Sequence, residues 1–220
     1  MRKAIIWDFN GTILSDVELS VEGLNLLRHR RSMTTVTVDQ YRDAFGFPVQ
    51  DYYQGLGFDF SREDFAALSH EYHSFYFANV HRCDPHQHVP ELMRELHQAG
   101  MEQYVLSAMQ EPELQQTLDT LALTPFLSGV YGLGDLLARG KVDRGRQLMA
   151  DAGLSPKQVV LVGDTDHDIE VALALEVQPV TLTIGHQSAH RFTRFDHPCF
   201  DSIAALRRAL LSWESGPLSA

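Results

Sequence analysis

Short apolar runs alternate with amphipathic stretches over much of the chain, and this pattern predicts the order of its secondary structure. The runs have the character of buried strands and fall at 4–7, 103–106, 129–131, 159–162 and 180–184. Between the later runs, apolar residues recur every three or four positions, as in helices that bury one face. Strands alternating with helices are typical of a parallel sheet covered on both faces, so we expect an α/β fold.

The stretch between the first two runs has a different pattern. Residues 16–86 show helical spacing and no convincing strand. Ser15 followed by Glu18 is typical of a capping box at the start of its first helix. We therefore expect a catalytic core of residues 1–15 and 87–220, with an inserted all-helical cap of residues 16–86 over the carboxyl edge of the sheet.

Polar residues follow the first apolar run directly. Asp8 comes at its end, and Gly11 in the next turn lets the backbone change direction without a Cβ penalty. Open α/β sheets place their chemistry at the carboxyl ends of the strands, so Asp8 is positioned as a nucleophile or a metal ligand. From this stretch alone, the alternative is an Asp that caps the next helix.

Two later strands also end in polar side chains. Ser107 ends one, Asp164 ends another with Asp168 four residues on, and Lys141 lies in a predicted loop at the same edge. Because parallel strands converge there, the three carboxylates are expected to meet, and their mutual repulsion calls for a cation. Oxygen-only ligands suit Mg²⁺, which also recruits phosphate oxygens. Lys141 can hold Asp8 ionised and pair with a phosphate.

Charge and composition limit the partners. The formal net charge of −11 argues against nucleic acid and against an anionic membrane, although a metal in a pocket still permits a small phosphorylated substrate. No apolar run approaches the ~18 residues of a membrane span. Two cysteines are too few for a disulfide framework, and three residues before the first strand leave no room for a signal peptide. We expect a cytoplasmic protein, and the sequence does not indicate its oligomeric state.

The four polar segments, in this order, resemble the motifs of the haloacid dehalogenase superfamily. They are Asp8-Phe9-Asn10-Gly11-Thr12, the strand that ends in Ser107, Lys141, and Gly163-Asp164-Thr165-Asp166-His167-Asp168. The helical insertion is similar to the cap of the phosphoglycolate-phosphatase-like branch, so the resemblance covers essentially the whole chain. It implies a Rossmann-like core with a helical cap, and a Mg²⁺-dependent phosphatase acting on a small phosphorylated metabolite.

The resemblance also implies a role for each motif residue. Asp8 would attack phosphorus to form an aspartyl-phosphate. Mg²⁺ would be held by the Asp8 carboxylate, the backbone carbonyl of Asn10 and the Asp164 carboxylate, with Asp168 orienting these ligands. The substrate phosphate would be bound by Gly11, Thr12, Ser107, Ala108 and Lys141.

Asn10 departs from the pattern of the family. Most phosphatases of the superfamily carry a second Asp at this position, which acts as general acid and then as general base. An amide cannot give or take the proton, and such help is worth about 10²–10⁴-fold. We therefore expect slow turnover and a preference for leaving groups that depart unprotonated, such as acyl or aryl phosphates.

Other reactions of the superfamily fit the sequence less well. A phosphonatase needs a cap lysine, and residues 16–86 contain none, while a dehalogenase has no use for the acidic cluster. The remaining alternative, which Asn10 keeps open, is a catalytically weak protein that binds a phosphorylated ligand as a sensor or regulator.

Three further segments have two interpretations each. Tyr52 and Tyr53 either line the substrate side of the cap or pack its interior. The arginines of residues 28–31 either reach an anionic part of the substrate or lie at a solvated helix end, and the second is favoured. Residues 185–188, after the last long strand, either border the site or form a structural turn, and the turn is favoured.

Overall fold

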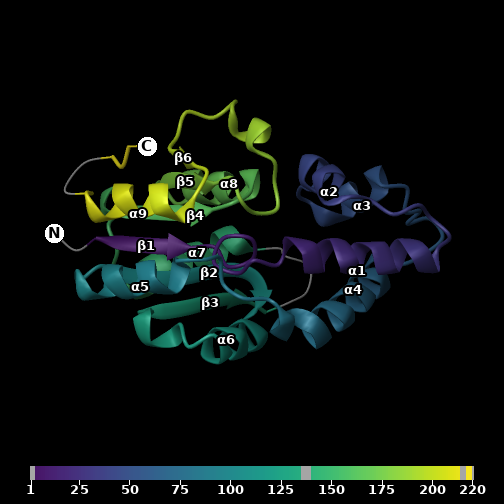
Figure 1. Cartoon of the computed structure of the whole chain (residues 1–220), viewed down its shortest axis with the longest axis horizontal. Helices are drawn as coiled ribbons and strands as arrows, with labels where there is room; N and C mark the ends of the chain where they lie inside the picture. The colour runs from purple at the N-terminus through teal and green to yellow at the C-terminus, as the bar shows by residue number, and fades with distance from the viewer. Residues whose placement is uncertain (1–2, 135–139, 214–216, 220) are drawn as a thin grey trace.

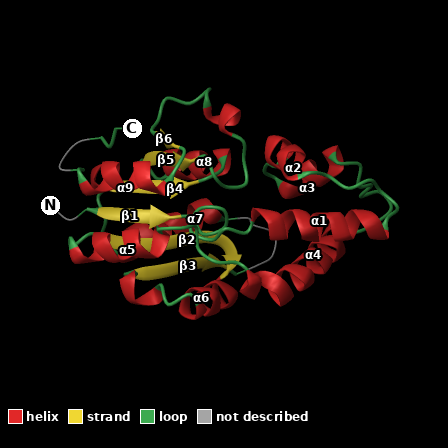
Figure 2. Cartoon of the chain, in the orientation of Figure 1, coloured by secondary structure: helices red, strands yellow, loops and turns green. Residues whose placement is uncertain are grey.

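A parallel sheet with β1 near its centre forms the core of the protein (Figures 1 and 2). The computed structural model describes residues 3–134, 140–213 and 217–219, and within them the sheet has six strands in the order β3-β2-β1-β4-β5-β6. The strands are β1 (Ala4–Trp7), β2 (Glu102–Gln110), β3 (Gly129–Leu133), β4 (Val159–Gly163), β5 (Gln178–Leu182) and β6 (Cys199–Phe200). The predicted α/β fold with a Rossmann-like core is confirmed.

The central strand shows why the first apolar run has no polar positions. Ile5 and Trp7 of β1 join one hydrophobic cluster, whereas Ala4 and Ile6 join another on the opposite face. Because both faces are covered, every position of this strand is fully buried. Trp7 lies in register with Val105 of β2 and Val162 of β4, so the residues that follow each strand emerge at one edge.

Helices cover both faces of the sheet. The cluster that contains Trp7 includes residues of α5 (Val89–Gln98), α6 (Glu111–Thr120) and α9 (Ile203–Leu211). The cluster that contains Ile6 includes residues of α7 (Lys141–Asp151) and α8 (Asp166–Ala174). Within the described parts of the chain, every helix is too short or too polar to cross a lipid bilayer.

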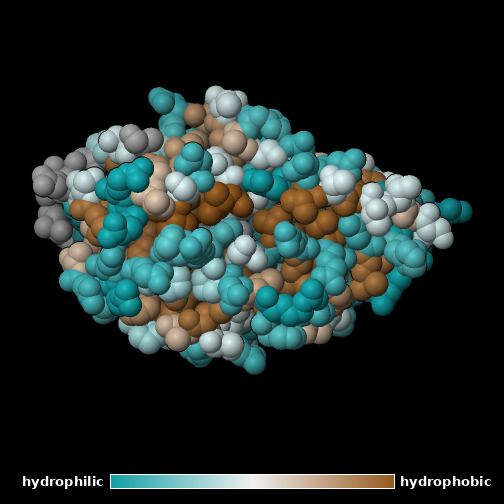
Figure 3. All heavy atoms as spheres, in the orientation of Figure 1, coloured by the Kyte–Doolittle hydropathy of each residue, from teal (hydrophilic) through white to brown (hydrophobic). Residues whose placement is uncertain are grey.

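Four helices lie beyond the carboxyl ends of β1 and β2, at the right of Figure 1, and are called the helical insertion below. They are α1 (Val17–Arg30), α2 (Val38–Ala44), α3 (Val49–Gly55) and α4 (Phe65–Asn79). They share a hydrophobic cluster of their own, which includes Leu24, Tyr41, Tyr52 and Leu68. The face drawn in Figure 3 is largely hydrophilic, with hydrophobic patches on both sides of the junction between sheet and insertion.

The entry into α1 differs from the prediction. The expected capping box of Ser15 and Glu18 is wrong, because Asp16 precedes the helix and its side chain makes no hydrogen bond to the helix. The Ser15 N–H instead donates to the Asp84 carbonyl at 3.0 Å, which ties the outgoing chain to the returning one. The Asp16 carboxylate is thereby left to face the carboxyl edge of the sheet.

Candidate active site

Three buried carboxylates meet at the carboxyl edge of the sheet. Asp8 follows β1, Asp164 follows β4 and Asp168 lies in the first turn of α8. Each offers an oxygen that lies within 4.8 Å of those of the other two. The structure thus brings together the side chains that the sequence placed at separate strand ends.

Lys141 lies in the middle of this cluster. Its Nζ donates to Asp8 Oδ1 at 2.5 Å and to Asp168 Oδ1 at 2.7 Å, and its side chain is 4% exposed. Burial lowers the pKa of Lys141, but the two carboxylates raise it further, so the ammonium stays charged. The prediction of a loop position is corrected, because Lys141 is the first residue of α7 and Gly140, at φ 101°, is its N-cap.

The cluster carries an excess of negative charge. Burial raises the pKa of Asp8 well above its usual value, with Lys141 opposing and the other two carboxylates adding to the rise. Burial likewise raises the pKa of Asp164 to about 6, although His186 lowers it. One ammonium therefore leaves three buried carboxylates incompletely neutralised, and an all-oxygen donor set of this kind fits a hard divalent cation.

The Asp168 carboxylate accepts four hydrogen bonds from the described residues, more than Asp164 or Asp8. Its Oδ1 accepts from Lys141, while Oδ2 accepts from the N–H groups of Asp164 and Thr165 and from the Thr165 hydroxyl. Both oxygens are therefore engaged within the protein. This arrangement suits a residue that orients the loop after β4.

Two glycines allow Asp164 to lie where it does. A Cβ built on Gly11 would lie 2.3 Å from Asp164 Oδ2, and one built on Gly185 would lie 2.2 Å from the same atom. The hydroxyl of Thr12 and the backbone N–H of His186 then fix the carboxylate, at 2.9 and 2.6 Å. The position of Asp164 thus depends on the absence of side chains at both glycines.

Gly185→Ala is expected to displace Asp164 and to weaken binding of a divalent cation by about 10–100-fold, the usual cost of losing support for a ligand. The affinity for Mg²⁺ is measured by calorimetric titration. Gly55→Ala is the matched control, because a Cβ there meets no atom within 4 Å. An unchanged affinity in Gly185→Ala would show that Asp164 does not hold the cation.

The residues assigned to the phosphate divide into two groups. Ser107, Ala108 and Lys141 line a cavity together with Asp8, and the Ser107 hydroxyl lies 3.5 Å from Asn10 Oδ1. Gly11 and Thr12 are not among the described residues that line it. Their N–H groups donate to the Asp16 carboxylate and to the Phe9 carbonyl, and the Thr12 hydroxyl donates to Asp164. In this structure both residues brace the loop that carries Asp8.

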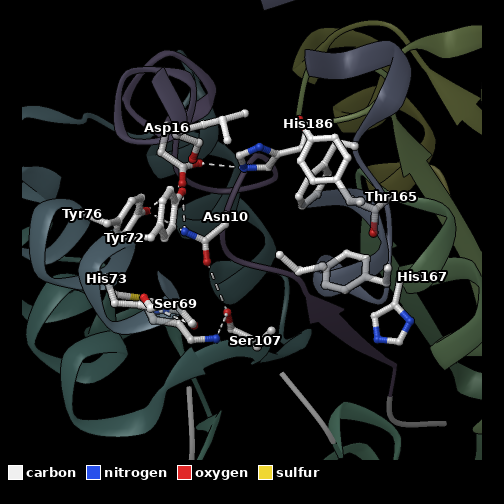
Figure 4. A pocket seen from close by; sticks show the side chains of 18 of the residues that line it. Asn10, Asp16, Ser69, Tyr72, His73, Tyr76, Ser107, Thr165, His167 and His186 are labelled. Carbon is white, nitrogen blue, oxygen red and sulfur yellow. Dashed lines mark hydrogen bonds and ion pairs between the residues drawn. The ribbon is translucent and has the colours of Figure 1, made fainter. Parts of the chain in front are cut away.

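Asn10 is part of a hydrogen-bond network centred on Asp16 (Figure 4). Its Nδ2 donates to Asp16 Oδ2 at 2.9 Å and to the Tyr76 hydroxyl at 2.7 Å. Tyr76, on α4, also donates to Asp16 Oδ2 at 2.6 Å, and the Gly11 N–H donates to Asp16 Oδ1 at 2.8 Å. Asp16 therefore links the loop after β1 to the helical insertion.

His186 completes this network from the other side of the cavity. Its Nε2 lies 3.2 Å from Asp16 Oδ1, and its Nδ1 lies 2.9 Å from the hydroxyl of Tyr41 on α2. Burial lowers the pKa of His186, but the Asp16 carboxylate raises it to about 9, so the ring is a cation at neutral pH. The favoured interpretation of residues 185–188 as a purely structural turn is corrected, because His186 lines the cavity.

The sequence alone does not single out Asp16, because Ser15 beside it offers an alternative capping residue. It leaves His186 within residues 185–188, which either border the site or form a turn. Their place after β5, at the carboxyl edge of the sheet, is where open α/β sheets gather their chemistry.

The cavity itself lies between the sheet and the helical insertion and has a volume of about 180 Å³. The catalytic candidates form one end, and aromatic residues of the insertion, Tyr52 and Tyr53 among them, form the other. Both interpretations of these tyrosines hold, because Tyr53 also stacks on Phe58 inside the insertion, with ring centroids 5.2 Å apart. None of the described residues of 28–31 lines the cavity.

Most of the chain matches a known protein family. The family described as haloacid dehalogenase-like hydrolase matches residues 5–182. Over 100 residues the chain is 33% identical to a phosphoglycolate phosphatase of Pseudomonas putida, a match that covers 44% of this chain and only 36% of that relative.

Solved structures of low sequence identity share the fold. A haloacid dehalogenase-like family protein of Streptococcus pneumoniae has a TM-score of 0.79 at 18% identity, covering 94% of this chain and 98% of that one. The protein tyrosine kinase A of Mycobacterium tuberculosis has a TM-score of 0.79 at 21% identity, covering 95% and 98%.

Proposed function

Because the chain belongs to the haloacid dehalogenase-like hydrolase family, we propose that it is a Mg²⁺-dependent phosphatase that hydrolyses a small phosphorylated metabolite through an aspartyl-phosphate on Asp8. One observation carries the proposal, namely that Asp8, Asp164 and Asp168 meet in one cluster, in which Lys141 pairs with Asp8 and Asp168 and these three residues line a cavity. The phosphoglycolate phosphatase of P. putida, 33% identical over 100 residues, supports a phosphate ester as substrate.

The proposed reaction has two displacements at phosphorus. A carboxylate oxygen of Asp8 forms a bond to phosphorus, and the bond to the leaving oxygen breaks with its electron pair on that oxygen. Water then attacks the phosphorus of the aspartyl-phosphate, which releases inorganic phosphate and restores the Asp8 carboxylate. Lys141 and Ser107 line the cavity beside Asp8 and are suited to hold the transferring phosphoryl group.

Mg²⁺, when bound, would neutralise charge on the phosphate and on the carboxylates. Asp8, Asp164 and the backbone carbonyl of Asn10 are the residues proposed to hold it. Asp168, with both oxygens engaged by Lys141 and the loop after β4, is proposed to orient them.

Residues 16–86 are proposed to act as a cap. Asp16, Tyr41 and Tyr76 connect this segment to the core through the hydrogen bonds around His186 and Asn10. Closure of such a segment over the substrate excludes water from the phosphoryl centre until the leaving group has departed.

A second candidate function is supported by the environment of Asn10. Its Nδ2 already donates to Asp16 and Tyr76, so this side chain has neither a proton nor a free donor to offer to a leaving group. The absence of a proton donor at position 10 fits a catalytically weak protein that binds a phosphorylated ligand without hydrolysing it.

Release of inorganic phosphate separates the two candidates. The purified protein is incubated with a panel of phosphate esters and acyl phosphates in Mg²⁺, and again with EDTA. Multiple turnovers that stop on chelation support the phosphatase. Binding of a phosphorylated ligand without turnover would support the regulatory protein instead.

A further inference from the structure

The cavity changes character with distance from Asp8. Its walls in the helical insertion are formed largely by the rings of Tyr41, Phe45, Phe47, Tyr52, Tyr53 and Tyr72. Phe45 and Tyr41 both meet the Tyr52 ring edge to face, with centroids 5.4 and 6.0 Å apart. An apolar cavity of about 150 Å³ holds benzene, so aromatic walls around a cavity of about 180 Å³ fit a small ring.

Free cations are scarce in this cavity. Lys141 is the one lysine or arginine among the described residues that line it, and it is already bound to Asp8 and Asp168. Of the histidines in the lining, His186 is bound to Asp16 and His167 lies 3.4 Å from Glu170. Burial lowers the pKa of the third, His73, and so disfavours its charged form. Arg28 donates to backbone carbonyls and Arg31 to Glu63 and Glu71, outside the cavity.

A substrate with a second anionic group would therefore bury that charge with no lysine or arginine free to pair with it, which is costly. This argues against phosphoglycolate, whose carboxylate lies at the end opposite its phosphate. The aromatic rings of the insertion favour an uncharged, apolar group in the part of the substrate that lies farthest from the phosphate.

Asn10 restricts the leaving group independently of the cavity walls. Its amide cannot supply a proton, so the leaving oxygen must depart as an anion. A phenol, with a pKa of about 10, departs as an anion far more readily than an alkyl alcohol.

Resting on the proposed phosphatase function, we infer that the substrate is an aryl phosphate, the phosphate ester of a small phenol, with its ring between the aromatic side chains of the insertion. In the reaction, the phosphorus–oxygen bond breaks as the Asp8 oxygen bonds to phosphorus, and the phenolate takes its proton from solvent. Hydrolysis of the aspartyl-phosphate then releases inorganic phosphate.

Steady-state kinetics with phenyl phosphate, acetyl phosphate and phosphoglycolate test the substrate class. Acetyl phosphate has the better leaving group but no ring, so chemistry alone would favour it. The aromatic cavity predicts a KM for phenyl phosphate at least about tenfold below that for acetyl phosphate, because only the phenyl ester buries a ring. Phosphoglycolate is expected to be the poorest of the three in kcat/KM.

The outcomes separate this inference from the proposed function. Release of phosphate from acetyl phosphate that depends on Asp8, with no lower KM for phenyl phosphate, would overturn the aromatic substrate and leave the phosphatase standing. Failure of every ester and acyl phosphate to release phosphate would overturn the phosphatase itself.

Discussion

Asp8→Asn is expected to abolish phosphate release, with a loss of about 10⁴-fold or more in kcat. The amide oxygen is a poor nucleophile, so no aspartyl-phosphate forms, and the remaining groups can only bind the substrate. Release of inorganic phosphate in Mg²⁺ measures the loss. Trapping of radiolabelled phosphate on the denatured wild-type protein, and its absence from Asp8→Asn, locates the intermediate.

The fold is expected to survive this substitution. Lys141 keeps its 2.7 Å contact with Asp168, so no buried ammonium is left alone. Burial raises the pKa of Asp8, which means that its ionised form is unfavourable in the folded protein. Without metal, the melting temperature of Asp8→Asn should therefore equal or exceed that of the wild type.

Asp143→Asn is the matched control for Asp8→Asn. It makes the same change on α7 at a side chain that is 81% exposed and, within the described part of the chain, is bound only to Arg146, so activity should be retained. Full activity in Asp8→Asn would exclude Asp8 as the nucleophile and with it the proposed mechanism.

The sequence predicted the core well because its signals are local. Residues 4–7 and 159–162 are uninterrupted apolar runs, and strands covered on both faces have this pattern. Asp8 and Asp164 were identified because a polar residue directly after such a run must emerge at the edge of the sheet. β6 escaped prediction because Cys199–Phe200 is too short to show any period.

The network around Asp16 could not be predicted, because it depends on how the helical insertion lies over the sheet. Tyr76 is 60 residues from Asp16, and His186 is 170 residues away. The sequence around Tyr76 or His186 does not predict that its side chain contacts Asp16. The spacing of Tyr52 and Tyr53 likewise predicts a buried helix face, and only the tertiary structure shows that this face borders a cavity.

Asn10→Asp is expected to raise kcat for an alkyl ester such as ethyl phosphate by about 10²-fold or more, and to raise it much less for phenyl phosphate. The gain differs because an alkoxide needs a proton to leave and a phenolate does not. Kinetics of release from both esters measure the ratio. A rate unchanged for both would show that the residue at position 10 does not limit the reaction.

The structure adds a cost to this substitution, since Asn10 Nδ2 lies 2.9 Å from Asp16 Oδ2. A carboxylate at position 10 would face another carboxylate, and the pair would retain one proton between them, as closely spaced carboxyl groups do. That proton is available to the leaving group. The repulsion that remains is expected to lower the melting temperature of the single variant.

Exchanging the two side chains, in Asn10→Asp combined with Asp16→Asn, should keep the gain and remove the repulsion between the carboxyl groups at positions 10 and 16. The amide at position 16 can donate to the Tyr76 hydroxyl, which can then donate to the carboxylate at position 10, so the existing hydrogen bonds run in the opposite direction. Asp16→Asn alone is the control, because it removes a carboxylate without supplying an acid beside Asp8 and should bring no gain. A double variant that is no faster than Asp16→Asn on ethyl phosphate would show that slow turnover does not arise from the missing acid.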